Sequence, residues 1–327
     1  MRTIQQLLPE EWKAFEQSFE QVLNTDQVTL QEVLHYIHLQ RGKQLRPQLV
    51  LLSAAISRGV TDKTISTAVA LELLHTATLV HDDVVDHSPM RRGKAAIQEQ
   101  WTNKVAVLVG DYILAKVIEM IDDLRCHSIV HLVAKMGQVL SKGELSQLHA
   151  GQSMWIDEKQ YFDIIHQKTA ELFGTCAQAG AQSCLATGKQ EQALRAFGLN
   201  LGMCFQLKDD ILDYSDSEEL GKPTMNDIRD GKVTLPLIIS MQRATKEEAA
   251  AIRSQAEILC KQESSASSTE IEEDIKSFVL RYQGVNYAYK KMEEYRRKAI
   301  AALDIFRESE FKQALLNMLD YAIHREW

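Results

Sequence analysis

Apolar residues at a spacing of three or four positions dominate the long stretches of this chain. Within Thr67–Val85, for example, Ala68, Leu71, Leu74 and Thr78 fall on one stripe, which matches the 3.6-residue period of a helix that buries one face. The same pattern recurs in residues 105–121, 129–148, 162–185 and 193–212. Segments that alternate with the two-residue period of a strand are missing, and only five prolines occur in 327 residues. The sequence therefore predicts an all-α fold, a helical bundle.

The chain shows no fixed-period repeat and no clear linker between domains. Residues 261–274, KQESSASSTEIEED, are rich in Ser and Glu. Because helical patterning resumes on both sides, we expect this stretch to be a solvated loop between helices. We predict a single domain over residues 1–327.

Composition excludes several classes of protein. A net charge of −8 gives no positive field to meet a nucleic-acid backbone. Five cysteines without a CxxC pair argue against a disulfide framework and a structural zinc site. The first residues, MRTIQQLLPEEW, lack the apolar segment of a secretory signal, and no apolar run is long enough to predict a membrane span. We expect a cytoplasmic protein.

Two aspartate motifs of the form DDxxD each follow an apolar helical run. The first, VHDDVVDHS, holds Asp82 and Asp86, and the second, QLKDDILDYS, holds Asp209 and Asp213. Residues i and i+4 share one face of a helix, so each motif sets two like charges side by side, where they repel each other. One such motif on a solvated face would mean little. Two of them after apolar runs predict a site that requires a counter-charge.

A divalent cation is the counter-charge that suits these carboxylates. Mg²⁺ prefers oxygen ligands and usually takes one or two carboxylates together with substrate phosphates and water. We therefore predict Asp82, Asp86, Asp209 and Asp213 as residues of a Mg²⁺ site.

Short basic motifs surround the acidic ones, namely GKQLRP, MRRGK, HQKTAELF and GKPTMNDIRDGKVTLP. The forked guanidinium of arginine pairs with phosphate oxygens, whereas lysine contributes a compact charge. Glycine and proline next to Lys43, Arg46, Arg91 and Arg92 fix tight turns and favour a functional role over solvated surface cations. Metal ions and positioned cations together stabilise a departing diphosphate. A second diphosphate held by cations alone would be bound without being ionised, and the sequence offers ligands for both kinds of pocket.

With these motifs in this order, from GKQLRP at residue 42 to the TLP that begins at residue 234, the chain resembles the trans-isoprenyl diphosphate synthases, the polyprenyl synthetase family. The resemblance implies a bundle of the isoprenoid synthase type with a central active-site cavity, and a homodimer. It also implies a reaction. Metal ions draw the diphosphate off an allylic diphosphate, the double bond of isopentenyl diphosphate attacks the allylic cation, and a proton is lost, so that each cycle adds one isoprene unit in trans.

The resemblance also carries roles to matching residues. Three Mg²⁺ ions on the allylic diphosphate would be held by Asp82, Asp86 and Asp209, with Asp213 supporting through water. The allylic substrate would contact Arg91, Lys168, Thr169, Gln206, Lys222 and Lys232. The isopentenyl diphosphate pocket would be formed by Lys43, Arg46, His75 and Arg92.

Two positions depart from the family pattern. The segment KAAIQEQ follows Arg91-Arg92-Gly93 where the family has a proline, and Asn226 stands where it often has a glycine before Asp227. Asparagine tolerates left-handed backbone better than most residues, so we expect the turn at Asn226 to be kept.

The residues one turn before the first acidic motif bear on product length. In this family they face the tunnel that receives the growing chain, and short-chain members place Phe or Tyr there. Ala77 and Thr78 are small, so we expect an open tunnel and a product of about C30–C50, of the kind used for quinone side chains. The alternative is that these residues only allow close helix packing. Met120, Val133 and Met136 are candidates for the tunnel floor.

Three other functions stay open on the sequence alone. The ExxH pairs Glu72–His75 and Glu32–His35 resemble those of di-iron carboxylate bundles. A di-iron site would leave the aspartate motifs unexplained. Iron analysis of the purified protein distinguishes a di-iron protein from a magnesium-dependent enzyme. A terpene cyclase shares the first acidic motif but usually has an Asn/Ser/Glu second motif and no GKxxRP pocket. A catalytically silent partner subunit tends to lose acidic motifs, and activity of this chain alone decides that case.

Overall fold

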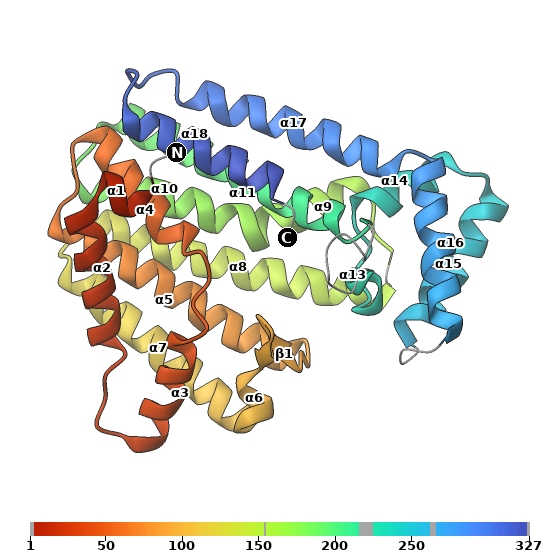
Figure 1. Cartoon of the computed structure of the whole chain (residues 1–327), viewed down its shortest axis with the longest axis horizontal. Coiled ribbons are helices and arrows are strands. Elements are labelled where there is room, and N and C mark those ends of the chain that lie inside the picture. The colour runs from red at the N-terminus through yellow and green to blue at the C-terminus, as the bar shows by residue number, and fades with distance from the viewer. Residues whose placement is uncertain (1–2, 154, 216–224, 262–265, 326–327) are drawn as a thin grey trace. The chain divides into compact units, whose positions relative to one another are not determined.

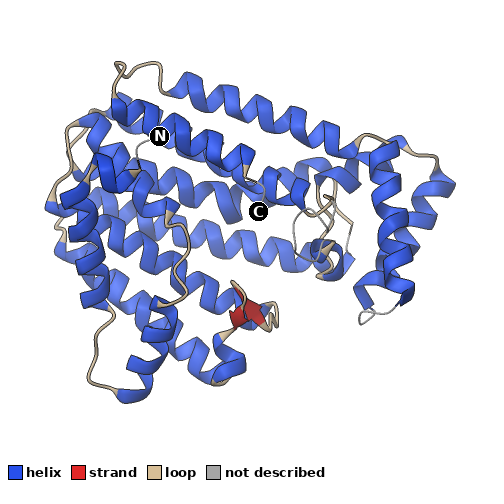
Figure 2. Ribbon diagram, in the orientation of Figure 1, coloured by secondary structure: helices blue, strands red, loops and turns tan. Residues whose placement is uncertain are grey.

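Helices make up most of the computed structural model, which describes residues 3–153, 155–215, 225–261 and 266–325 (Figures 1 and 2). The all-α prediction is confirmed. The chain divides into two compact units. Unit 1 comprises residues 1–135, 175–195 and 303–316, and unit 2 comprises residues 136–174, 196–302 and 317–327. No helix in the described part of the chain is both long and apolar enough to span a membrane.

Unit 1 contains α1 (Ile4–Leu7), α2 (Pro9–Val22), α3 (Val28–His38), α4 (Leu45–Ser57), α5 (Asp62–Val85), β1 (Met90–Arg91), β2 (Lys94–Ala95), α6 (Ile97–Gln100) and α7 (Asn103–Asp123). Unit 2 contains α9 (Glu158–Ile165), the π-helical turn η1 (His166–Ala170), α13 (Asn226–Arg229), α14 (Leu235–Arg243), α15 (Lys246–Lys261), α16 (Ala266–Arg281) and α17 (Gly284–Ala302). Residues of α8 (His127–Ser153), α10 (Glu171–Ser183), α11 (Gly188–Leu212) and α18 (Glu310–His324) belong to both units.

Helix α5 is the central helix of unit 1 and packs against α2, α4 and α7. It begins at a capping threonine, Thr61, whose side chain accepts a hydrogen bond from the Thr64 N–H. Many of its apolar side chains, Leu71 and Leu73 among them, are fully buried. This packing fixes the end of α5, where the first acidic motif lies.

A short antiparallel β-hairpin follows α5, and no alternating pattern in the sequence predicted it. Strand β1 pairs with β2 so that Met90 faces Ala95 and Arg91 faces Lys94. The two turn residues, Arg92 and Gly93, have φ of 52° and 76°, as in the type I′ turns that connect tight hairpins. The motif MRRGK is therefore a hairpin turn that presents its arginines on a rigid backbone.

Close helix approach in unit 2 depends on small residues. A Cβ added at Gly198 of α11 would lie 2.4 Å from the Phe173 carbonyl oxygen of α10. The neighbouring rings of Phe173 and Phe197 are fully buried, so the contact between the two helices is dry and tight. This contact holds the part of α11 that leads to the second acidic motif.

The expectation of a loop over residues 261–274 is wrong. Helix α15 ends at Lys261 and α16 begins at Ala266, while residues 262–265 lie outside the described part of the chain. Ile275 and Phe278 of α16 are buried, and their apolar contacts outweigh the weak helix propensity of the serines before them.

Replacing Gly198 by alanine tests the close approach of α10 and α11. The new methyl group would collide with backbone atoms, which cannot move aside as a flexible side chain does. We expect Gly198→Ala to lower the free energy of unfolding by about 1–3 kcal/mol, the usual cost of overpacking. Denaturant unfolding measures it. Gly137→Ala in α8, where an added Cβ meets nothing within 4 Å, is the matched control and should be neutral or slightly stabilising.

Candidate active site

The first acidic motif forms the last turn of α5 in unit 1. Asp82 and Asp86 are half-buried, and the Asp86 N–H donates to the Asp82 carbonyl oxygen at 2.8 Å. Asp83, between them, is buried and points elsewhere, because its carboxylate binds the guanidinium of Arg91. The motif thus offers two accessible carboxylates and uses the third inside the fold.

The pair between Asp83 and Arg91 attaches the hairpin to α5. Arg91 Nε donates to Asp83 Oδ1 and Oδ2 at 2.9 and 3.1 Å, and Arg91 Nη2 also donates to Oδ1. The amide of Gln98 adds bonds to the carbonyl oxygens of Asp83 and Ser88, at 3.0 and 2.6 Å. These contacts fix the direction of the hairpin turn.

A cationic pocket lies beside this motif in unit 1. Its lining includes His75 and Arg92, both predicted for isopentenyl diphosphate, and Arg91. Arg92 Nη1 donates to the Gln40 carbonyl oxygen at 2.5 Å. A Cβ at Gly42 would lie 2.7 Å from Arg92 Nη2. Glycine at this position therefore leaves room for the arginine.

Burial and neighbouring arginines set the charges in this cationic pocket. Burial lowers the pKa of His75 well below 6.5, and the charges of Arg46 and Arg92 lower it further. The imidazole is therefore neutral near pH 7 and acts as a hydrogen-bonding group. Burial raises the pKa of Glu72, while the same two arginines oppose that rise. Arg46 thus acts on the pocket electrostatically, whereas Lys43 is exposed and is not part of its lining.

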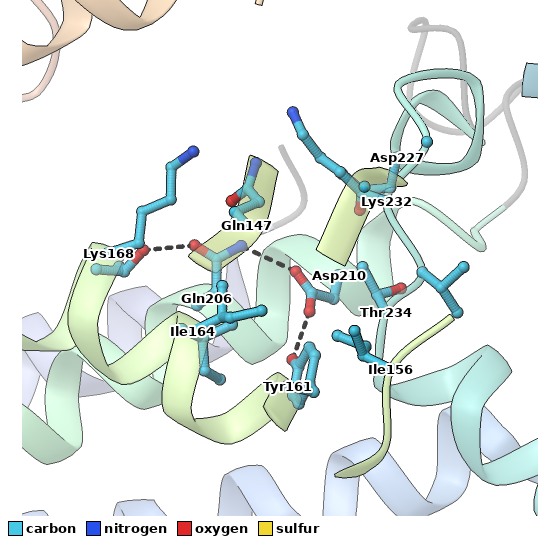
Figure 3. A pocket seen from close by; sticks show the side chains of 15 residues that line it. Gln147, Ile156, Tyr161, Ile164, Lys168, Gln206, Asp210, Asp227, Lys232 and Thr234 are labelled. Atoms are coloured by element: carbon cyan, nitrogen blue, oxygen red, sulfur yellow. Dashed lines mark hydrogen bonds between the residues drawn. The ribbon is translucent and has the colours of Figure 1, made fainter. Parts of the chain in front are cut away.

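A second pocket lies in unit 2, beside the second acidic motif. Four residues predicted for the allylic diphosphate line it: Lys168, Thr169, Gln206 and Lys232. Lys168 and Thr169 belong to the π-helical turn η1, a widened turn that occurs frequently at functional sites. In Figure 3 the side chains of Lys168 and Lys232 extend to the same side of the pocket.

A chain of hydrogen bonds crosses the floor of the unit 2 pocket (Figure 3). Thr169 Oγ1 donates to Gln206 Oε1 at 2.7 Å, and Gln206 Nε2 donates to Asp210 Oδ1 at 2.9 Å. The hydroxyl of Tyr161 donates to the other oxygen of Asp210. The carboxylate of Asp210 is therefore held from α9 and from its own helix, and it is almost fully buried.

Asp213 of the same motif accepts two backbone bonds from the start of α13. The N–H groups of Asn226 and Asp227 donate to its carboxylate at 3.0 and 3.1 Å. The left-handed backbone predicted for Asn226 is instead at Met225, with φ of 61°, so that expectation is corrected. Asn226 instead begins the helical turn of α13, and its N–H is one of the two that donate to Asp213.

Asp209 is half-exposed and pairs with a residue near the C-terminus. Its Oδ1 lies 2.7 Å from Arg325 Nη2, and the Arg325 guanidinium stacks 3.8 Å above the ring of Phe205. Asp209 therefore accepts a cation at the position where a metal ligand was predicted.

The structure places several of the predicted residues in one pocket of unit 1 and one pocket of unit 2. Other residues that were not predicted line the same pockets. Lys222 lies outside the described residues. Arg91, predicted for the allylic diphosphate, belongs to unit 1. Sequence reasoning missed Tyr161, Asp210 and Asp227, which also line the unit 2 pocket. The double aspartate of DDxxD was a signal for Asp210, but a tyrosine on an amphipathic helix carries no signal of its own.

Comparison with known proteins identifies the family. A family model described as polyprenyl synthetase matches residues 27–275. The chain belongs to the polyprenyl synthetase family. It is 34% identical over 325 residues to an octaprenyl diphosphate synthase from Haemophilus influenzae, a match that covers 99% of this chain and 97% of that protein. As a member of this family it is a prenyltransferase.

Solved structures agree with this membership of the polyprenyl synthetase family. A polyprenyl synthase from Caulobacter crescentus, complexed with calcium and isoprenyl diphosphate, superposes with a TM-score of 0.90 at 31% identity and covers 99% of this chain and 97% of that one. A geranylgeranyl pyrophosphate synthase from Bacteroides thetaiotaomicron gives 0.82 at 36% identity, with 98% of each chain covered. The isoprenoid synthase fold is thereby confirmed.

The carboxylates of unit 2 suit a divalent cation that binds together with a substrate. Burial raises the pKa of Asp210 to about 7 and that of Asp227 well above its usual value, and the negative charges of neighbouring aspartates contribute to both shifts. Their mutual repulsion would be relieved by a bound cation. Among the described residues no three carboxylate, histidine or cysteine side chains converge closely enough to hold a metal alone.

The raised pKa of Asp210 predicts how stability depends on pH in metal-free protein. Between its usual value of 3.8 and about 7, the folded state holds a proton that the unfolded state has released. The contribution of Asp210 to the free energy of unfolding is therefore present at low pH and is lost as the pH rises through 7. We expect the melting temperature in EDTA to fall from pH 5 to pH 8, and to fall less in Asp210→Asn. Asp163→Asn, an exposed change on α9, should keep the wild-type slope. An unaltered slope in Asp210→Asn would contradict the assignment.

Proposed function

We propose that this prenyltransferase is a Mg²⁺-dependent polyprenyl diphosphate synthase that condenses isopentenyl diphosphate with an allylic diphosphate. One observation carries the proposal. In unit 2, Lys168, Thr169, Gln206 and Lys232 line one pocket with Asp210 of the second acidic motif. A pocket with two lysines beside a set of aspartates suits a diphosphate that binds together with metal ions.

The residues of the chain divide the work between two diphosphates. Three Mg²⁺ ions would be held by Asp82, Asp86 and Asp209. Asp213 would support them through water. When bound, the metal ions neutralise the charge that develops on the departing diphosphate. Lys168 and Lys232 hold the allylic diphosphate, as would Arg91 and Lys222, while Thr169 and Gln206 orient it. Lys43, Arg46, His75 and Arg92 bind isopentenyl diphosphate away from metal, so that its diphosphate is kept.

One incubation tests the central proposal. The purified chain alone is mixed with labelled isopentenyl diphosphate, Mg²⁺ and allylic primers of increasing length, and the products are separated by chromatography. We expect chain elongation that stops in EDTA. Absence of product from every primer would overturn the proposal. If activity then required an added partner, the chain would be one component of a two-part enzyme, and one relative is named heptaprenyl diphosphate synthase component 2.

The proposed product is long, about C30–C50, and Ala77 is the residue on which this depends. Ala77 is fully buried on α5, and Thr78 donates from Oγ1 to the His75 carbonyl oxygen at 2.8 Å. The names of the relatives are compatible with either a long or a shorter product, since octaprenyl and all-trans-nonaprenyl synthases occur beside the geranylgeranyl enzyme. The side chain at this position therefore needs a direct test.

Replacing Ala77 by phenylalanine should shorten the product by at least one isoprene unit if a tunnel passes this position. A ring there would block the growing chain, and Ala77→Val should shift the product distribution less. The product ladder of each variant is compared with wild type at equal enzyme activity. A full-length ladder together with a lower melting temperature would mean that Ala77 serves only helix packing.

We also propose that the protein is a homodimer, formed through the exposed apolar face of α7. Val107, Leu108 and Ile118 are 40%, 67% and 70% exposed, and apolar groups of this kind gathered on one helix mark interaction surfaces. Light scattering should give twice the chain mass. Ile118→Lys should halve that mass, whereas a monomeric wild-type protein would contradict the proposal.

The cellular role is proposed from product length. A polyprenyl diphosphate made in the cytoplasm would supply the side chain of a quinone. Deletion of the gene should then abolish or shorten the quinone side chains that mass spectrometry detects in the host, and unchanged quinones would exclude this role.

A further inference from the structure

Two polar residues of the cationic pocket in unit 1 have no role in the reaction described so far. Gln40 and Arg41 directly precede the Gly42-Lys43 motif, and both line the pocket that also contains His75. Neither belongs to the residues predicted for isopentenyl diphosphate. Both carry N–H donors, so they add hydrogen-bonding capacity beyond the predicted set.

Arg41 is held firmly through two of its three nitrogens. Its Nε donates to the His38 carbonyl oxygen at 3.2 Å, and its Nη2 lies 2.8 Å from His38 Nε2. Its guanidinium also lies 5.7 Å from the centre of the Phe19 ring. Burial, followed by the charge of Arg41, lowers the pKa of His38, so the neutral imidazole accepts from the arginine. The side chain is thereby fixed before any ligand arrives.

The third nitrogen of Arg41 is the one with nothing to bind. Nη1 is buried and makes no hydrogen bond to any described residue. Gln40 Nε2 is in the same state, although the Gln40 backbone is anchored by Arg92. A buried donor without a partner destabilises the protein, because it has lost its bonds to water and gained none in return. Two such donors lining one pocket indicate a ligand rich in oxygen.

The charges of the pocket favour an anion. Three guanidinium groups line it, from Arg41, Arg91 and Arg92, against the carboxylates of Glu72 and Asp83. The Asp83 carboxylate is taken up by Arg91. Glu72 is buried with one oxygen that makes no hydrogen bond, and burial raises its pKa, which favours the neutral acid. A diphosphate therefore meets more positive than negative charge here.

We propose that Arg41 Nη1 and Gln40 Nε2 bind the diphosphate of isopentenyl diphosphate directly, as two donors in addition to Lys43, Arg46, His75 and Arg92. The proposal rests on the proposed function for the identity of the ligand. It makes Arg41 a preorganised contact, because its guanidinium is already oriented by His38 and Phe19 and loses little freedom on binding.

The test is the affinity of the full-length protein for isopentenyl diphosphate, measured by calorimetry without an allylic substrate. A hydrogen bond from a charged group contributes about 1.5–3 kcal/mol, so Arg41→Gln should weaken binding by about 10- to 100-fold. Arg41→Lys keeps the charge without the fork and should fall between. Arg307→Gln removes the same charge at an exposed residue of unit 1 and should bind as wild type does.

Gln40→Glu supplies a second readout with almost no change in shape. A carboxylate in place of the amide would repel the diphosphate, and we expect the KM for isopentenyl diphosphate to rise at least 10-fold while the KM for the allylic primer stays within twofold. If Arg41 and Gln40 only support the fold, the variants lower the melting temperature and change both KM values alike, or bind as wild type does. Either result overturns the proposal.

The calorimetric measurement also separates this inference from the proposed function. If the wild-type chain binds isopentenyl diphosphate but forms no product, the proposed function fails while the role of Arg41 is still tested. If product forms and Arg41→Gln binds normally, the proposed function stands and this inference fails.

Discussion

A buried carboxylate governs the architecture of the unit 2 pocket. Asp210 has little contact with water, and it is held by the hydroxyl of Tyr161 and the amide of Gln206. Because Gln206 also accepts from Thr169, the same chain of bonds fixes the floor of the pocket. An ionised group in such a place costs free energy unless a partner cation arrives. Burial raises the pKa of Asp210 to about 7, so near neutral pH the group either holds a proton or needs a balancing cation. A site of this kind can therefore favour metal and diphosphate together.

In the proposed function, the unit 1 pocket would hold an anion without a metal. Its cations are positioned by ordinary fold contacts: Arg91 by Asp83, and Arg92 by the carbonyl oxygen of Gln40. A tight hairpin turn sets the direction of both arginines. His75 stays neutral among them, so it adds a hydrogen bond without adding charge. Rigid donors of this type suit the proposed binding of a diphosphate whose bond to carbon stays intact.

Sequence patterns predicted the helical class and several of the polar residues that line the two pockets, because both follow from local spacing. The 3.6-residue period located α5, α7, α8 and α11, and the paired aspartates at i and i+4 marked the ends of two helices. The hairpin escaped prediction because strands of two residues have no period to detect. Residues 266–274 were mistaken for a loop because their serines obscured the buried Ile275 and Phe278 that follow. Tyr161 and Gln40 could not be predicted as site residues, since their positions depend on tertiary contacts. The single-domain assignment and the roles of the individual site residues stay predictions.

The π-helical turn at His166–Ala170 has a geometrical effect on everything after it. An α-helix turns about 100° per residue, so one additional residue in a turn rotates the faces of α10 by roughly that angle relative to α9. Residues 162–185 read in sequence as one uninterrupted amphipathic helix, yet α9 buries Tyr161 and Ile165 whereas residues 171–177 of α10 are all buried. Lys168 and Thr169, neighbours in sequence within this turn, both line the pocket. Removing one residue there would realign the two helices and turn that pair of side chains toward different surroundings.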